Sequence, residues 1–339
     1  MLNRLSGCHP TRSLLRSLGP SVSPAAEEVP VPAELSADAA RELAAGLLGL
    51  PVAAAAQVSS SAGTQVFRIT AGTRSAFLKP GGAGAVQREV AVLTLAGDLG
   101  VPVPEILAAD PDGAVTGVPC VLILQARGKP CTSDSPEFAA IGAKVRLLHE
   151  VRLAGFGSVV AATAGLRGEN ASWADAVAHR ITGVRPAADA GLVPATLVDR
   201  AETAVRDRPQ VLTAAHGGRL LHADLHPRHV YARSGQVTAI IDWADATCGD
   251  PVFDLARVLH SATMGRELEH GFAVLRSFLD SYGDAPWLGA RLTESVLVHA
   301  VVFILWAMRC EFEGGAPWPP WWPAQCAALT AILGELEQT

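Results

Sequence analysis

Short strand-like stretches occupy the first part of the chain, and longer helical patterns follow. Four stretches have the length and the β-branched or aromatic content of strands; they are Val52–Val58, Thr64–Thr70, Ser75–Lys79 and Cys120–Gln125. Between them, Ala85–Ala96 carries apolar residues at helical spacing. Residues 50–125 are therefore predicted to form a small sheet with one helix.

The region before this sheet divides into two parts. Residues 1–33 are rich in Ser, Pro, Gly and Arg without apolar periodicity, which predicts a flexible N-terminal tail. Ser36 is placed to cap a helix over Ala37–Leu48, and Gly49 with Pro51 supplies the stop signal. The first folded unit is thus expected over residues 34–125.

Helical patterns dominate from Glu137 onward, after a turn-rich linker at 125–130. The exception is a predicted hairpin, in which Val230–Ala232 and Val237–Ile241 flank a Ser-Gly turn. Strands first and helices later indicate an α+β chain of two lobes, with a second, mainly helical lobe over residues 126–339.

Composition narrows the class of protein. The 339 residues are 49% hydrophobic, so a large core is available, and the net charge of −6 offers no basic field for nucleic acid. Six scattered Cys without a paired motif favour a reducing, cytoplasmic location. The longest apolar run, Val296–Met308, is shorter than the roughly 20 residues of a membrane span, so no membrane partner is expected.

The segment richest in chemistry contains two acidic residues. Asp224 lies in a loop of turn-forming residues, and Asp242 directly follows the apolar strand of the predicted hairpin. The hairpin is expected to fold the two carboxylates together. One carboxylate that holds a divalent cation and another that orients a hydroxyl are the parts that phosphoryl transfer requires.

This segment resembles the aminoglycoside and macrolide (antibiotic) phosphotransferase family, which has a bilobal protein-kinase-like fold. The family signature reads here His222-x-Asp224 with His229 in the usual Asn place, then Ile-Asp242-Trp, then Gly249-Asp-Pro-x-x-Asp-Leu-Ala256. The resemblance implies a small, mainly β N-lobe that binds nucleotide and a larger helical C-lobe with the catalytic loop and an acceptor pocket.

The resemblance also implies roles. Asp224 is the expected catalytic base, Asp242 the metal ligand, and His222 a brace for the loop. The expected cofactors are Mg²⁺ and ATP or GTP as phosphoryl donor. His229 is a candidate metal or phosphate ligand, with loop bracing as the alternative, because imidazole suits Mg²⁺ less well than an amide oxygen. The number of metal ions stays open.

The first lobe offers matching nucleotide-binding residues. Ser61 and Gly63 lie in a loop between two strands that is placed to arch over phosphates. Lys79, one of three lysines in the chain, ends the next strand, and Glu89 follows on the helix. Such a Lys–Glu pair steadies the phosphates in kinases. The residues around Gln125 and Arg127 are expected to meet the purine edge.

Acceptor contacts are predicted from aromatic and acidic residues of the second lobe. The candidates are Trp173, Asp175, Glu311, Trp318 and Trp322. For each the alternative is ordinary packing or a solvated charge. Asp250 and Asp254 are expected to cap helices or brace the loop, and Arg228 is expected to face solvent.

The expected function is transfer of the γ-phosphoryl group to a hydroxyl of an antibiotic, for resistance or self-protection, in a monomer or a homodimer. A metabolic kinase for homoserine, choline or a sugar uses the same machinery and is the first alternative. A non-catalytic nucleotide-binding regulator is the second. A zinc hydrolase built on His222, His226 and His229 is the third, although it leaves the downstream motifs unexplained.

Overall fold

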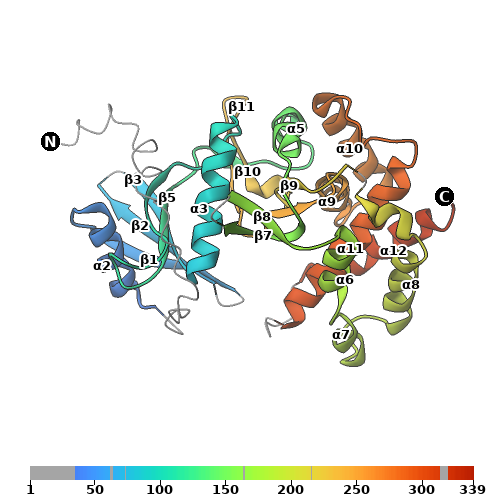
Figure 1. Cartoon of the computed structure of the whole chain (residues 1–339), viewed down its shortest axis with the longest axis horizontal. Coiled ribbons are helices and arrows are strands. Elements are labelled where there is room, and N and C mark those ends of the chain that lie inside the picture. The colour runs from blue at the N-terminus through green and yellow to red at the C-terminus, as the bar shows by residue number, and fades with distance from the viewer. Residues whose placement is uncertain (1–34, 62–63, 73, 163–164, 215, 314–319) are drawn as a thin grey trace.

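The computed structural model describes residues 35–61, 64–72, 74–162, 165–214, 216–313 and 320–339 (Figure 1). The predicted tail, Gly63 and Trp318 therefore lie outside the described residues. A sheet-rich part at one end of the molecule adjoins a helical part at the other. This arrangement confirms the predicted α+β class with a sheet-rich part and a helical part.

A five-stranded antiparallel sheet forms the first lobe, in the order β1-β2-β3-β5-β4. Its strands are β1 (Ala54–Ser61), β2 (Thr64–Ala71), β3 (Arg74–Pro80), β4 (Ile106–Asp110) and β5 (Cys120–Leu124). β4 was not expected. It is an edge strand with two alanines, so its sequence lacks the branched residues that mark the other strands.

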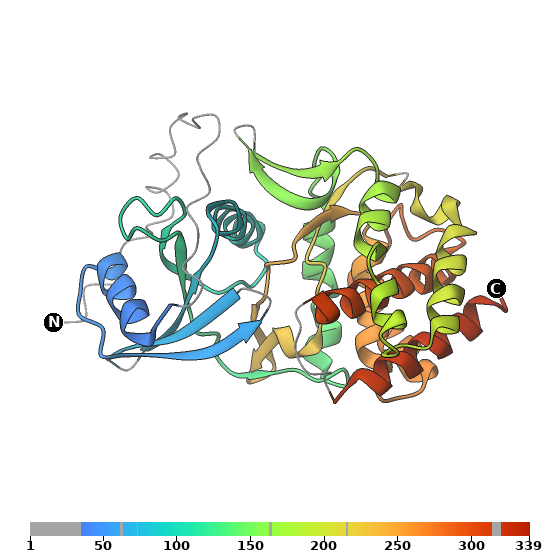
Figure 2. The same ribbon diagram turned by 90° about the horizontal axis from the view of Figure 1, so that it is seen from below.

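Helix α2 (Ala37–Leu48) lies on one side of this sheet, and α3 (Ala83–Asp98) lies between the sheet and the helical part (Figures 1 and 2). α2 has the predicted bounds. Its Ser36 hydroxyl accepts a hydrogen bond from the Ala39 amide at 3.2 Å, and Gly49 ends it in the left-handed conformation. The buried side of α3 includes Glu89, which directs a carboxylate toward β3.

The helical lobe packs around one long helix, α11, which contacts α6, α8, α9 and α12. Its helices are α4 (Pro136–Ala140), α5 (Gly142–Glu150), α6 (Trp173–Ile181), α7 (Arg185–Asp189), α8 (Ala195–Arg206), α9 (Val252–Thr263), α10 (Leu268–Tyr282), α11 (Leu292–Glu313) and α12 (Trp322–Leu336). α9 is buried along its whole length.

Among the described helices, α11 alone has the length and hydropathy of a membrane span, with a mean hydropathy of 1.6 in its most apolar window. That window is 61% buried inside the protein. A helix at the centre of a helical lobe passes the same test, and the neighbouring helices cover it here. Its composition therefore reflects burial in the protein core.

Two small sheets carry the catalytic segments. One has the order β8-β7-β12-β9 and the other β11-β10-β6. Their strands are β6 (Lys129–Pro130), β7 (Phe156–Ala162), β8 (Gly165–Asn170), β9 (Arg219–Leu221), β10 (Val230–Arg233), β11 (Gln236–Ile240) and β12 (Thr247–Gly249). The β10–β11 hairpin was expected. The β7–β8 hairpin was not, because its glycines and polar residues hide the strand pattern.

Candidate active site

The loop that carries Asp224 begins where β9 ends and is held from below by a buried carboxylate. Asp254, in the first turn of α9, accepts hydrogen bonds from the amides of His222 at 2.9 Å and Ala223 at 2.7 Å, and from His149 Nε2 at 3.1 Å. Ala223 has a positive φ of 64°, which is rare for a residue with a side chain. Asp254 thus fixes a strained turn immediately before Asp224.

His222 links this loop to the Asp242 segment. Its Nδ1 accepts the Asp224 amide at 3.2 Å, and its Nε2 donates to the Ile241 carbonyl at 2.9 Å. These two bonds require the neutral tautomer with the proton on Nε2. They are the contacts of a brace, as the family resemblance implied.

Asp242 follows β11 in a left-handed conformation, with φ 67°. The next residue, Trp243, is buried, and its indole N–H donates to the Ile240 carbonyl at 2.7 Å. The Asp242 side chain itself is 48% exposed. The donor atoms of Asp224, His229 and Asp242 all lie within 4.8 Å of one another. The structure therefore brings the two predicted carboxylates together.

Arg257 is the main residue of the site that sequence reasoning missed. It lies on α9, one turn after Asp254, and its Nε donates to Asp224 Oδ1 at 2.8 Å. Burial opposes ionisation of Asp224, but the charge of Arg257 and the hydrogen bond from Arg257 outweigh it and hold the pKa well below its usual range. Its position directly after the Asp-Leu-Ala motif was the available signal.

A chain of buried hydrogen bonds supports Arg257 from behind. Its Nη1 lies 3.1 Å from His260 Nδ1, and His260 Nε2 donates to Gln325 Oε1 at 2.8 Å. Burial lowers the pKa of His260 to about 3, so the ring is neutral and accepts from the guanidinium. Helix α12 is thereby connected through α9 to Asp224.

His229 uses both ring nitrogens within the protein. Nδ1 lies 3.0 Å from the Asp224 carbonyl, and Nε2 accepts from Arg228 Nε at 3.1 Å. Burial lowers the pKa of His229, so the ring is neutral. With Nδ1 donating and Nε2 accepting, the Nε2 lone pair is already occupied. The bonds favour the loop-bracing alternative over metal ligation.

The donor set fits one magnesium ion. Mg²⁺ takes oxygen ligands and keeps several waters. Asp242 offers an exposed carboxylate, and Asp224 adds a second one nearby. The zinc-hydrolase alternative fits less well, because His226 Nδ1 accepts the Arg228 amide at 3.0 Å and His222 is engaged on both sides.

Lys79 and Glu89 form the ion pair expected of the first lobe. Lys79 Nζ lies 2.5 Å from Glu89 Oε1, and their side chains are 13% and 10% exposed. Ser61 is the last residue of β1, at the turn into β2. The predicted phosphate-holding roles of these residues stay predictions.

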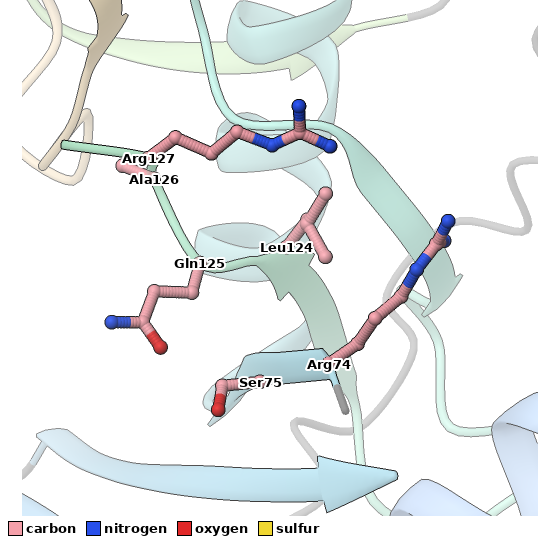
Figure 3. Close-up of a pocket in the computed structure, with 6 residues that line it drawn as sticks. All are labelled: Arg74, Ser75, Leu124, Gln125, Ala126 and Arg127. Carbon is pink, nitrogen blue, oxygen red and sulfur yellow. The ribbon is translucent and has the colours of Figure 1, made fainter. Parts of the chain in front are cut away.

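The segment that connects the lobes borders a cavity of about 310 Å³ (Figure 3). Its lining residues are Arg74, Ser75, Leu124, Gln125, Ala126 and Arg127. The side chains of Arg127 and Arg74 point to one side, and Gln125 and Ser75 point to the other. Ser75 and Lys79 lie an even number of residues apart on β3, so their side chains share one face of the sheet. Gln125 points to the same side as Ser75 and therefore shares the face of Lys79.

Two predicted acceptor contacts are wrong. Trp173 is 1% exposed, and its indole N–H donates to His299 Nε2 at 3.0 Å inside the helical core. Trp322 is 6% exposed and donates to the Leu192 carbonyl at 3.0 Å. Both indoles are buried in the helical lobe, so the packing alternative accounts for them.

Two of the remaining acceptor candidates, Asp175 and Glu311, lie among the described residues and are accessible. Asp175 is exposed and accepts the Ser172 hydroxyl at 2.6 Å in a cap at the start of α6. Glu311 lies half-buried in the last turn of α11. Their acceptor roles stay predictions.

Asp245 is a further carboxylate of the site whose role the sequence left open. Its side chain is exposed at the surface. Desolvation by the surrounding protein is the largest cause that raises its pKa to about 6, and the charge of Asp224 is the second. The charge of Arg180 acts in the opposite direction and that of Asp242 in the same one. The reaction centre therefore carries three neighbouring acids, one of which titrates near neutral pH.

The sequence profile of the phosphotransferase enzyme family matches residues 54–292. The chain belongs to this family. The match contains β1 to α10, together with Asp224, Asp242 and Arg257. The family and the kinase-like fold expected from the catalytic signature are thus confirmed.

Solved structures of kinases share the fold. A thermostable mutant of aminoglycoside phosphotransferase APH(4)-Ia, in complex with AMP-PNP and hygromycin B, is 18% identical with a TM-score of 0.61 and covers 89% of this chain and 100% of that one. Choline kinase LicA from Streptococcus pneumoniae is 16% identical with a TM-score of 0.58, covering 84% and 94%. A putative fructosamine-3-kinase from Thermobifida fusca is 20% identical with a TM-score of 0.56, covering 87% and 98%.

Sequence similarity to a curated protein is more local. Uncharacterized protein YcbJ of Bacillus subtilis (strain 168) is 35% identical over 78 residues. The aligned part is 23% of this chain and 23% of that protein. This similarity extends over less than a quarter of either chain and does not identify an acceptor.

Proposed function

We propose that the protein transfers the γ-phosphoryl group of ATP or GTP to a hydroxyl of a small molecule, with Mg²⁺ as cofactor. The observation that carries this proposal is the convergence of Asp224 and Asp242, held within 4.8 Å by two strained turns. Membership of a phosphotransferase family and the nucleotide in the APH(4)-Ia structure support it. We also propose that the protein is located in the cytoplasm.

In the proposed reaction, the acceptor oxygen forms a bond to the γ-phosphorus as the bond to the bridging oxygen breaks and ADP or GDP leaves. Asp224 receives a hydrogen bond from the acceptor hydroxyl and orients it, and the hydroxyl proton passes through Asp224 to solvent. With a pKa held low by Arg257, Asp224 is a weak base. Such a base suffices because the transition state is loose, so positioning dominates catalysis.

The other residues hold the donor. Lys79, which lies 2.5 Å from Glu89, is proposed to neutralise phosphate charge. The main chain at 125–127 is proposed to contact the purine. Asp242 would hold Mg²⁺, which would supply positive charge against the charge that develops on the phosphates.

We propose an antibiotic as the acceptor, for resistance or self-protection. The support is the family signature together with the fold shared with the hygromycin B-bound phosphotransferase. A metabolic acceptor is the second candidate, favoured by the fold shared with choline kinase and the fructosamine-3-kinase. The two candidates differ only in the acceptor.

The experiment is an acceptor panel analysed by mass spectrometry with ATP and with GTP. Aminoglycosides, macrolides and nucleoside antibiotics form one arm, and choline, homoserine and fructosamines form the other. A product heavier by one HPO₃ identifies the acceptor. Asp224→Ala is expected to lose several orders of magnitude in turnover while it keeps nucleotide affinity. Nucleotide binding without ADP or GDP release in either arm would instead indicate a regulator.

A further inference from the structure

The guanidinium of Arg228 lies beside the reaction centre. Its Nε donates to His229 Nε2 at 3.1 Å, and His229 Nε2 in turn lies 3.6 Å from Asp242 Oδ2. Arg228 is exposed, as the sequence predicted, and its Nε is also bonded to His229. The cation is thus two contacts away from the proposed magnesium ligand.

The residue that Arg228 contacts stands at a position that matters in the family signature. In the family signature an Asn stands where this chain has His229, and its amide oxygen suits Mg²⁺. Here the imidazole accepts from Arg228 and its other nitrogen faces the Asp224 carbonyl at 3.0 Å. No lone pair remains for a second ion unless Arg228 leaves.

The guanidinium also lacks a carboxylate of its own. Among the described residues, no acidic side chain forms an ion pair with Arg228, whereas Asp224 is already held by Arg257 at 2.8 Å. The charge of Arg228 additionally disfavours the protonated forms of Arg257 and His226. An exposed cation beside other cations is stabilised when an anion binds, and a guanidinium matches phosphate oxygens in two parallel hydrogen bonds.

We propose that Arg228 binds the terminal phosphate of the nucleotide in place of a second divalent ion, so that the enzyme works with a single metal. This inference rests on the proposed function, because it needs a bound nucleoside triphosphate. It names Arg228 as a further catalytic residue and assigns His229 to hold the guanidinium in position.

The first test counts metal ions by electron paramagnetic resonance of Mn²⁺ titrated into the full chain with AMP-PNP. The wild type is expected to bind one Mn²⁺ per nucleotide complex. The double variant Arg228→Ala, His229→Asn restores an amide oxygen and removes the cation, and it is expected to bind two. Two ions in the wild type overturn the inference. One ion in the double variant overturns it as well, because the guanidinium would then not be standing in a metal site.

The second test compares the affinities of two nucleotides by calorimetry with Mg²⁺. Arg228→Gln is expected to weaken AMP-PNP about tenfold or more, since charge-assisted bonds to the terminal phosphate are lost. ADP, which lacks that phosphate, is expected to change less than about threefold. Arg228→Lys keeps a charge without the fork and is expected to fall between. Equal losses for both nucleotides contradict the proposal.

A matched control is Arg276→Gln, which removes the same charge from an exposed position on α10. It is expected to bind both nucleotides as the wild type does. If the wild type binds AMP-PNP and Arg228→Gln binds it equally well, the inference fails while the proposed function stands. If the wild type binds no nucleotide, both fail.

Discussion

Arg257 holds Asp224 by one short bond, 2.8 Å from Nε to Oδ1, and both groups are largely closed off from solvent. The bond leaves the second carboxylate oxygen, Oδ2, on the side of His229, 3.4 Å from Nδ1. One oxygen is therefore fixed by Arg257, and in the proposed reaction the other receives the hydrogen bond of the acceptor hydroxyl. The orientation of the carboxylate follows from α9 as well as from its own loop.

Replacement of Arg257 is expected to affect turnover more than binding. Arg257→Met removes the fixed bond, and misplacement of a catalytic group costs on the order of 10²-fold in rate. We expect kcat to fall by that order with the KM for nucleotide nearly unchanged, as measured with the acceptor found in the panel. Arg257→Lys retains a cation and is expected to recover part of the loss. A raised KM with normal kcat would contradict the orienting role.

The Lys79–Glu89 pair makes a separate prediction about donor binding. Lys79→Met removes a charge-assisted phosphate contact of about 1.5–3 kcal/mol, or roughly ten- to a hundredfold in affinity. Glu89→Gln retains Lys79 but frees it to move, so a smaller loss is expected. Titration calorimetry with AMP-PNP and Mg²⁺ measures both. Unchanged affinity in Lys79→Met would remove Lys79 from the nucleotide site.

Asp254 is expected to matter for stability. Asp254→Ala leaves His149 and the amides of His222 and Ala223 without their buried acceptor. The free energy of unfolding should fall by about 3 kcal/mol or more, as measured by urea denaturation. Asp254→Asn keeps an acceptor oxygen and should cost less. Equal stability of the alanine variant and the wild type would show that Asp254 is not the anchor of the loop.

Asp245 makes stability depend on pH. Its pKa is raised from 3.8 to about 6, so the native state binds a proton more tightly than the unfolded chain does. Ionisation therefore destabilises the fold increasingly as pH rises from about 4 to about 6, and the cost levels off above. Asp245→Asn removes this cost. In the presence of a metal chelator, the Tm of Asp245→Asn should equal that of the wild type near pH 4 and exceed it at pH 8.

An Asp245→Asn variant whose Tm difference from the wild type is the same at both pH values would contradict the raised pKa. Asp175→Asn is the matched control, because the same substitution at an exposed cap lies outside this cluster of acids.

The sequence predicted those features that rest on local chemistry. Helix α2 was located by its Ser36 cap and Gly49 stop, and the Asp224 and Asp242 segments were located by their motif. Bonds between residues far apart in the sequence could not be predicted from such local patterns. The Asp224–Arg257 bond joins residues 33 apart, and the Arg257–His260–Gln325 chain depends on where α12 lies relative to α9. Nothing in a local pattern fixes such packing.

The errors have a related cause. Trp173 and Trp322 were expected in an acceptor pocket because aromatic residues suit pocket walls and core packing equally well. Only burial and the indole hydrogen bonds to His299 and the Leu192 carbonyl separate the two roles.

The β12–β9 pairing joins the segment that carries Asp224 and the segment that carries Asp242 into one rigid unit. Thr247 faces Leu221 across these strands, and the Ile241 amide donates to the His229 carbonyl at 2.8 Å. Any swing of the first lobe relative to the second would consequently carry Lys79 toward or away from both carboxylates at once. The distance between Asp224 and Asp242 would not change in such a motion. Lobe closure would therefore change the contacts of Lys79 with the donor and leave the arrangement of the two carboxylates as it is.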